Sequence, residues 1–359
     1  MIVYFSLLIY TIIIMKLNIS NKRLRSIIYF IPLWLVNGLR SGIGTDYSMY
    51  EEYFYLINQF NIKDIISSDS FRMENGYNIL NKFVSYICND AQIIFLVSSF
   101  FILFLIIKSS KDYFSKYDYN IILFIMLGYY HSSFNGIRQY IAIAIFIYSV
   151  RYIFSKNMFK YIILIIIATS FHRTAICLLP IYFITNKIYS KLFLILGVII
   201  SLFSNYAYEI ILNKILPVIN SSYYYTYIDS KYVNEGIGGA GNEILLILLV
   251  LLIIISIVFR EHLIRLDSKN NFYINILIIG LFLRVLGFQS QLFFRMSLYF
   301  LIFTIYLLPY IYEYMFKKYY IISKACIIMF LIFCFCFTLV TRDQVIPYKM
   351  NLEFLKHVF

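Results

Sequence analysis

The sequence contains little charge and few residues that interrupt helices. Only 14% of its 359 residues are charged, and it has 5 prolines and 13 glycines, whereas 62% of the residues are hydrophobic. A soluble domain cannot bury that much apolar surface, but a lipid bilayer accommodates it, because helices satisfy their own backbone hydrogen bonds there. The composition therefore argues against a soluble protein and predicts an all-α integral membrane protein.

Cysteine and histidine are also scarce, with 5 and 4 residues. Cys334 and Cys336 are too close together for a zinc-binding pair, and no His or Cys partners follow them. Four of the five cysteines lie in apolar runs, where cysteine behaves as a small hydrophobic residue. We therefore expect neither a metal site nor a disulfide framework, and we expect no cofactor.

Acidic residues are fewer than basic ones, 18 against 31, which gives a net charge of +13. In a soluble protein this excess would suggest nucleic acid as a partner, but no basic stretch has the interleaved pattern of a nucleic-acid module. Retention of lysine and arginine in cytoplasmic loops explains the charge instead. The expected partner is the lipid bilayer, and nucleic acid is not expected.

About twelve apolar spans can be recognised, and together they predict one polytopic transmembrane domain over residues 1–359. Two long loops, about 40–90 and 205–242, fall on the outer side. Several spans are shorter than the ~20 residues of a straight crossing, so bilayer thinning, snorkelling ends or incomplete crossings must make up the difference. The predicted spans are residues 2–15, 26–39, 91–107, 119–131, 137–154, 157–171, 173–185, 191–204, 243–259, 272–288, 293–312 and 320–340.

The distribution of charge orients these spans. If the loop around Lys16–Arg25 is cytoplasmic and the spans alternate, the cytoplasmic loops hold 18 of the 31 bases but only 5 of the 18 acids, as the positive-inside rule requires. Both termini then lie outside a bacterial cytoplasmic membrane. Residues 157–185 could form one helix or two, and the charge rule favours two, with His172 and Arg173 at an outer turn. The stretch 236–241 is either a plain linker or a flexible gate.

Arginine, rather than lysine, marks the outer ends of the spans. A charged side chain at membrane depth costs a few kcal/mol, so it usually faces a partner or a wet cavity. Snorkelling to the headgroups would explain a single arginine, whereas several planar guanidinium groups suit the bidentate binding of phosphate. We therefore predict an external diphosphate ligand, with a polyprenyl diphosphate as the obvious carrier. The predicted ligands are Arg40, Arg138, Arg173, Arg284 and Arg295.

Three further residues on the outer side are predicted to carry chemistry. Asp46 follows two glycines after Arg40, so its carboxylate is expected near that guanidinium, where it could act as a general base toward a sugar hydroxyl. The alternative is a structural cap for an amphipathic helix over residues 50–60. His172 could orient phosphate, transfer a proton or bind a backbone carbonyl, and Glu74 is a reserve acid in the same outer loop.

Short blocks distributed over about residues 37–348 resemble the motifs of the EpsG family of Wzy-like polysaccharide polymerases. The most specific is Asn135-Gly136-Ile137-Arg138-Gln139-Tyr140-Ile141-Ala142, which is similar to the family's N-x-[IL]-R-Q-x-[IL]-A block. The other blocks are Gly44-Thr45-Asp46-Tyr47 within residues 40–50, Glu74-Asn75-Gly76-Tyr77, Ser170-Phe171-His172-Arg173-Thr174-Ala175, Arg295-Met296-Ser297-Leu298-Tyr299-Phe300 and Pro347-Tyr348.

The resemblance implies a polytopic glycosyltransferase of GT-C-like architecture. Such an enzyme polymerises undecaprenyl-diphosphate-linked oligosaccharide units into a surface polysaccharide outside the cytoplasmic membrane, by block transfer of the growing chain onto a new unit. A chain-length regulator and a flippase of the same pathway are the expected protein partners. The expected catalytic residues are Asp46, His172, Arg138 and Glu74, and the expected glycan contacts are Tyr47, Gln139 and Asn135.

Two alternative functions use the same lipid-linked sugar. A flippase or other transporter needs ionisable groups or broken helices near the midplane of the membrane and access from both sides. In this sequence the notable charges lie at the outer ends of spans, which favours an enzyme that acts on one face. An O-antigen-ligase-like transferase would share the diphosphate site and the outer face, and only the order of the motifs separates it from a polymerase.

Overall fold

The fold is given by a computed structural model that describes residues 1–17, 19–67, 71, 73–184, 187–210, 214, 236, 238–319, 322–342 and 344–354. Helices dominate these residues, and among them no strand forms beyond an isolated antiparallel bridge between Arg40 and Met350. The chain divides into two compact units, Met1–Tyr182 with Cys326–Phe359 and Phe183–Ala325. The prediction of a helical protein is confirmed, whereas a single domain over 1–359 stays a prediction.

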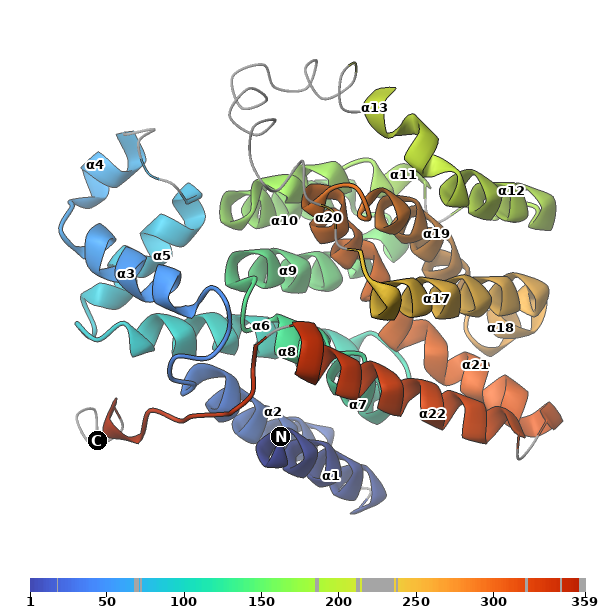
Figure 1. The fold of residues 1–359 in the computed structure, drawn as a ribbon, viewed down its shortest axis with the longest axis horizontal. Coiled ribbons are helices and arrows are strands. Elements are labelled where there is room, and N and C mark those ends of the chain that lie inside the picture. The colour runs from blue at the N-terminus through green and yellow to red at the C-terminus, as the bar shows by residue number, and fades with distance from the viewer. Residues whose placement is uncertain are drawn as a thin grey trace. The chain divides into compact units, whose positions relative to one another are not determined.

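The first unit contains the whole N-terminal half of the chain and most of α22 (Figure 1). Its elements are α1 (Ile2–Leu17), α2 (Lys22–Gly38), α3 (Tyr47–Asn58), α4 (Ile62–Ser67), α5 (Asn75–Ser85), α6 (Gln92–Asp112), α7 (Tyr117–Met126), α8 (Tyr129–Ser132), α9 (Ile137–Phe154), α10 (Met158–Phe171), a 3-10 helix (Arg173–Leu178) and a π-helix (Thr338–Arg342). The border with the second unit falls within α11 (Ile181–Ile184) and α22 (Ile322–Phe337).

The core of the first unit is formed where α6 packs against α2 and α9, and where α9 packs against α10. The close approach of α2 to α6 depends on Gly38, because a Cβ there would lie 2.9 Å from the Cα of Leu96. The indole of Trp34 donates a hydrogen bond of 2.8 Å to the carbonyl of Leu96, which fixes the same contact. These helices support the segment after α2 and the start of α9, where two of the motifs lie.

The second unit is built around α19 (Asn270–Leu286), which packs against α12, α17, α18, α20 and α21. The other elements are α12 (Lys191–Leu202), a 3-10 helix (Ser204–Ala207), α13 (Tyr208–Ile210), α17 (Ala240–Val258), α18 (Arg260–Leu266), α20 (Gln291–Leu301) and α21 (Thr304–Tyr319). Most of the predicted outer loop 205–242 lies outside the described residues, and the predicted linker or gate ends where α17 begins at Ala240.

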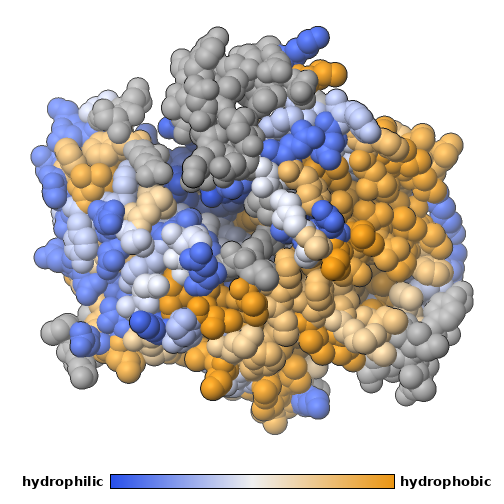
Figure 2. All heavy atoms as spheres, viewed as in Figure 1, coloured by the Kyte–Doolittle hydropathy of each residue, from blue (hydrophilic) through white to orange (hydrophobic). Residues whose placement is uncertain are grey.

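The protein is a multi-pass membrane protein. Among the described residues, α6, α9 and α17 are long and apolar enough to cross a bilayer, and the bent pair α20–α21 gives a fourth crossing if it counts as one span. Seven shorter apolar helices coincide with other predicted spans. In unit 2, the surface over α12 and α17 is largely apolar, as a face toward lipid would be (Figure 2). The total of twelve spans stays a prediction.

Two predicted spans are interrupted in the structure. The span 119–131 breaks at Gly128, which has a φ of +82° between α7 and α8 and lies against Thr338. The span 293–312 bends by 53° between α20 and α21. Pro309 in α21 lacks the N–H that would bind the carbonyl of Ile305, and its ring crowds that carbonyl. Both ranges are helical, but neither forms a single straight helix.

The segment 157–185, predicted as one helix or two, contains a break after Phe171. Helix α10 begins after Asn157, whose side chain accepts a hydrogen bond of 3.1 Å from the N–H of Lys160, and it ends at Phe171. His172 then has extended backbone angles, with φ −154° and ψ 113°, before the 3-10 helix starts. The prediction of two segments that meet at His172 and Arg173 is confirmed.

The predicted outer loop 40–90 is largely helical. It contains α3, α4 and α5, and α3 begins three residues before the amphipathic helix that was expected over 50–60. The surface over these three helices is mostly hydrophilic (Figure 2). A polar layer of short helices therefore lies at this end of the first unit, next to the motif residues.

Candidate active site

The carboxylate of Glu74 joins three segments that are far apart in the sequence. Glu74 precedes α5, and its Oε2 forms an ion pair with the Arg138 guanidinium on the first turn of α9. Its Oε1 accepts a hydrogen bond of 3.1 Å from the backbone N–H of Arg173 and lies 3.3 Å from Nδ1 of His172. Four residues predicted for the site are thereby brought together.

The local backbone explains why these groups meet. Gly76, in the first turn of α5, lies directly against the end of α10, and a Cβ there would approach the backbone oxygen of Ser170 to 2.6 Å. Because α10 ends at Phe171, the N–H of Arg173 is directed to Glu74 instead of a carbonyl within that helix. The glycine in the Glu74 block and the helix end in the His172 block are therefore parts of one contact.

The Glu74 side chain is only 10% exposed, so its ionisation depends on its neighbours. Burial by itself raises the pKa of this carboxyl, but the contact with His172, the charge of Arg138 and the N–H of Arg173 outweigh burial and lower the pKa from 4.5 to about 2. Glu74 is therefore a carboxylate at neutral pH. It balances one of the two guanidinium groups, so the cluster keeps an excess of positive charge.

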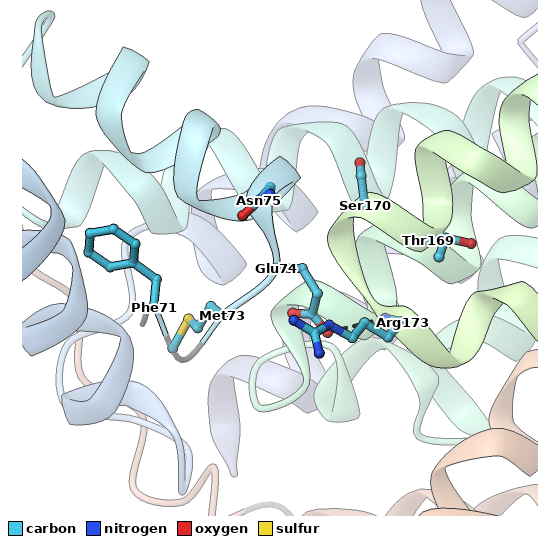
Figure 3. A pocket seen from close by; sticks show the side chains of 7 residues that line it. All are labelled: Phe71, Met73, Glu74, Asn75, Thr169, Ser170 and Arg173. Atoms are coloured by element: carbon cyan, nitrogen blue, oxygen red, sulfur yellow. Dashed lines mark hydrogen bonds between the residues drawn. The ribbon is translucent and has the colours of Figure 1, made fainter. Parts of the chain in front are cut away.

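A cavity of about 340 Å³ opens beside this cluster (Figure 3). Two of its hydroxyl groups already donate hydrogen bonds to their own helix, Thr169 to the carbonyl of Ile165 and Ser170 to that of Ile167, so their oxygens present lone pairs as acceptors. Acceptors of this kind beside a guanidinium suit a ligand with sugar hydroxyls and phosphate. The cavity is lined by Phe71, Met73, Glu74, Asn75, Thr169, Ser170 and Arg173.

Arg40 was predicted as a diphosphate ligand, and the structure gives it an enclosed position with 0% exposure. Its guanidinium donates to the side-chain oxygen of Asn37 at 2.8 Å and to the carbonyl of Phe134 at 2.8 Å. It also lies 4.8 Å from the ring centre of Phe95 and 5.0 Å from that of Phe134. These contacts connect the end of α2 to the segment before α9. Contact of Arg40 with a diphosphate stays a prediction.

Asp46 lies in the segment that follows α2. The N–H of Thr45 donates to the side chain of Asn135 at 2.8 Å, and Gly44 packs on that amide with a φ of +98°. The Asp46 carboxylate accepts a hydrogen bond of 3.1 Å from the Thr45 hydroxyl. Asp46 is the N-cap residue of α3 and its carbonyl accepts a hydrogen bond of 3.1 Å from the N–H of Tyr50, but its side chain makes no capping hydrogen bond. Among the described residues, the Arg40 guanidinium forms no ion pair with Asp46 and donates to Asn37 and Phe134 instead.

The C-terminal segment also holds the residues that follow α2. Apart from the Pro347-Tyr348 block, sequence reasoning did not predict this contact. The N–H of Ser41 donates to the carbonyl of Lys349, and that of Asn351 donates to Leu39 at 2.7 Å. Gln92, at the start of α6, donates to the carbonyls of Gly38 and Arg40. A buried glutamine and an exposed C-terminal strand-like segment carry no recognisable signal in one sequence, because their partners are backbone carbonyl groups.

The three predicted glycan contacts all have partners within the protein. Tyr47 is buried, stacks on Phe95 with ring centres 4.4 Å apart and donates to Gln92 at 3.3 Å. Asn135 holds Thr45, as described above, and Gln139 is 5% exposed on the first turn of α9. Their contact with a glycan stays a prediction.

Arg284 and Arg295 belong to the second compact unit. Arg284, on α19, is nearly buried, donates to the side chain of Asn242 at 2.9 Å and lies 4.5 Å from the ring centre of Phe294. Arg295 is partly exposed on α20. Their contact with a diphosphate stays a prediction. In the described part of the chain, no three His, Cys, Asp or Glu side chains come together as metal ligands.

Comparison with known proteins identifies one family. The family model described as the EpsG family matches residues 22–350, which is most of the chain. The matched range contains both the cluster around Glu74 and the segment that holds Arg40. Neither a curated protein nor a solved structure matches the chain significantly.

Proposed function

Because the chain belongs to the EpsG family, we propose that it is a membrane glycosyltransferase that polymerises undecaprenyl-diphosphate-linked oligosaccharide units into a surface polysaccharide. The family is related to Wzy-like polysaccharide polymerases, which supports a polymerase-like role in polysaccharide biosynthesis. The finer parts of the proposal are the lipid carrier, the extracytoplasmic face of a bacterial cytoplasmic membrane, a GT-C-like architecture of twelve spans, and a chain-length regulator and a flippase as partners.

The observation that carries the proposal is the joining of three motif blocks at one carboxylate. Glu74 contacts Arg138, which is 64 residues away, and the N–H of Arg173, which is 99 residues away. These contacts lie at the wall of a polar cavity. Residues that are needed only for folding could be distributed anywhere in the unit, whereas here Glu74 and Arg173 line a space that a sugar and a phosphate can enter.

The two guanidinium groups are proposed to bind the diphosphate of the donor. Arg173 lines the cavity, and Arg138 is held in place by Glu74. The acceptor hydroxyl oxygen forms a bond to the anomeric carbon of the donor while the bond from that carbon to the diphosphate oxygen breaks. The electron pair leaves with the diphosphate, where the positive charge of the cluster stabilises it.

The acceptor proton is proposed to pass to His172. Its Nδ1 faces the Glu74 carboxylate at 3.3 Å, which favours the tautomer with hydrogen on Nδ1 and leaves Nε2 as the basic nitrogen. Glu74 itself is a weak base because its pKa is about 2. Its proposed role is to orient His172 and Arg138. Asp46 is the second candidate for the base.

Deletion of the gene, followed by analysis of lipid-linked and surface glycans, tests the function. Loss of a polymerase leaves single repeat units on the final acceptor. Loss of a flippase leaves no repeat units outside, and loss of a ligase leaves polymer on the lipid carrier. Single units on the acceptor, restored to polymer by the wild-type gene, support the proposal, and either other pattern contradicts it.

A further inference from the structure

A second cavity lies between α2 and α6, at the ends of these helices opposite to Gly38. Its volume is about 270 Å³. The two helices run antiparallel, since the end of α2 contacts the start of α6, so the start of α2 and the end of α6 lie at the same level. Three basic side chains line the cavity there, namely Arg23, Lys108 and Lys111.

The basic residues outnumber the acid that contacts them. Lys108 and Lys111 share Asp112, at 3.3 and 3.4 Å, and Arg23 adds a further positive charge. The Lys108 and Lys111 side chains are 36% and 21% exposed, so their long stems pack on the helices while their ammonium groups reach the cavity. Three bases against one acid leave a local charge of about +2 for an anionic group.

Apart from Ser26, the remainder of the cavity wall is apolar and continues along the helices. Ile27, Phe30 and Phe104 line it. Phe104 stacks on Phe100 with ring centres 5.6 Å apart, and Phe100 contacts Phe30 edge to face at 5.4 Å. Ile27 is 52% exposed and Phe104 is 43% exposed, on the surface of two predicted spans. An apolar strip that leads to a basic end matches a molecule with an acyl chain and an anionic head.

We propose that this cavity, which we call the α2–α6 groove, binds an anionic phospholipid. The phosphate and headgroup lie among Arg23, Lys108 and Lys111, and one acyl chain follows Ile27, Phe30 and Phe104. A zwitterionic lipid would fill the same apolar strip but lacks the net negative charge that the basic end attracts. Inorganic phosphate would use the basic end alone. The groove is distinct from the cavity beside Glu74 and serves to hold the protein in an anionic leaflet.

Native mass spectrometry of the purified full-length protein measures which lipids it retains. The probes are phosphatidylglycerol, phosphatidylcholine of equal chain length, and glycerol phosphate. The test variant carries Arg23→Gln, Lys108→Gln and Lys111→Gln, and the matched control carries Lys16→Gln, Lys156→Gln and Lys160→Gln at exposed bases elsewhere. Each basic residue near a membrane surface strengthens anionic binding about fivefold. We expect the test variant to lose phosphatidylglycerol by at least about tenfold, and the control to retain it.

Equal retention of phosphatidylglycerol and phosphatidylcholine by the wild type, or full retention of phosphatidylglycerol by the test variant, would overturn the proposal. So would binding of glycerol phosphate as tight as that of the lipid. If the triple variant does not fold, Ile27→Trp fills the apolar strip with all charges kept and should displace the lipid. A photoactivatable phosphatidylglycerol on the wild type gives an independent reading, and cross-links outside residues 22–31 and 100–112 would contradict the site.

Discussion

The side chain of Glu74 is ionised and nearly enclosed, which makes it the residue on which the geometry of the cluster depends. Breaking a buried ion pair by removal of one partner leaves the other charge uncompensated. The structure therefore predicts that Glu74 acts chiefly by fixing Arg138 and His172 in place. A catalytic group that is positioned in this way can be distinguished experimentally from the carboxylate that positions it.

His172 and Asp46 compete for the role of base, and their variants separate the two. A general base contributes about 10²–10⁴-fold to a rate. His172→Gln should lower polymerisation by an amount in this range, because His172 lies 3.3 Å from the Glu74 carboxylate that lines the cavity. Asp46→Asn should change it less than threefold, since the Asp46 carboxylate bonds Thr45. The measurement is polymer formed per unit of protein in membranes. The reverse pattern would transfer the base to Asp46.

The depressed pKa of Glu74 predicts how stability depends on pH. Its pKa is 4.5 when unfolded and about 2 when folded, so the ion pair contributes its full stability above pH 4.5 and loses it as pH falls toward 2. A shift of this size corresponds to about 3 kcal/mol. The melting temperature of the wild type should exceed that of Glu74→Gln at pH 7, and the difference should vanish near pH 2. A constant difference across this range would contradict the assignment.

At the scale of helices, the site depends on the contact between α5 and α10. Gly76→Ala introduces a Cβ that meets the Ser170 backbone, and such overpacking costs about 1–3 kcal/mol. Because Glu74 and Arg173 lie on either side of this contact, polymerisation should fall together with thermal stability. Gly136→Ala is the matched control, since its nearest neighbour lies 3.8 Å away. Equal behaviour of the two variants would show that the contact does not position the site.

Sequence reasoning predicted the helices better than their interruptions. An apolar run locates a helix because the mean hydropathy over many residues is high. That mean does not reveal a φ of +82° at Gly128 or the 53° bend between α20 and α21. The division at His172 was predictable, because charge on both sides constrained it.

Sequence reasoning also named the members of the cluster around Glu74 without their pairing. Arg138, His172 and Arg173 could be selected because charge is rare at span ends. They converge on Glu74 because segments 64 and 99 residues apart in the sequence pack together. Such long-range contacts cannot be recognised in one sequence. Arg40 had the same sequence signal but a different environment, because its partners are backbone carbonyl groups and aromatic faces.

At the scale of the whole molecule, the proposal requires that α3, α4 and α5 lie outside the cytoplasm. In a cysteine-free background, a cysteine at Ser67 in the exposed end of α4 should react with an impermeant thiol reagent in intact cells. A cysteine at Lys160, on the predicted cytoplasmic side, should react only after the membrane is disrupted. Reversed labelling would invert the topology, and it would place the Glu74 cavity on the wrong face for an extracytoplasmic polymerase.

The central claim is that the polysaccharide is extended in the cavity beside Glu74, and filling this cavity tests the claim most directly. Thr169→Trp places an indole in the cavity and leaves Glu74, Arg138 and His172 unchanged, while Ile166→Trp places one on the same helix at a 57% exposed position that does not line the cavity. The measurement is the length distribution of the surface polysaccharide at matched protein abundance. We predict single repeat units for Thr169→Trp and full-length polymer for Ile166→Trp. Full-length polymer from Thr169→Trp would contradict the account.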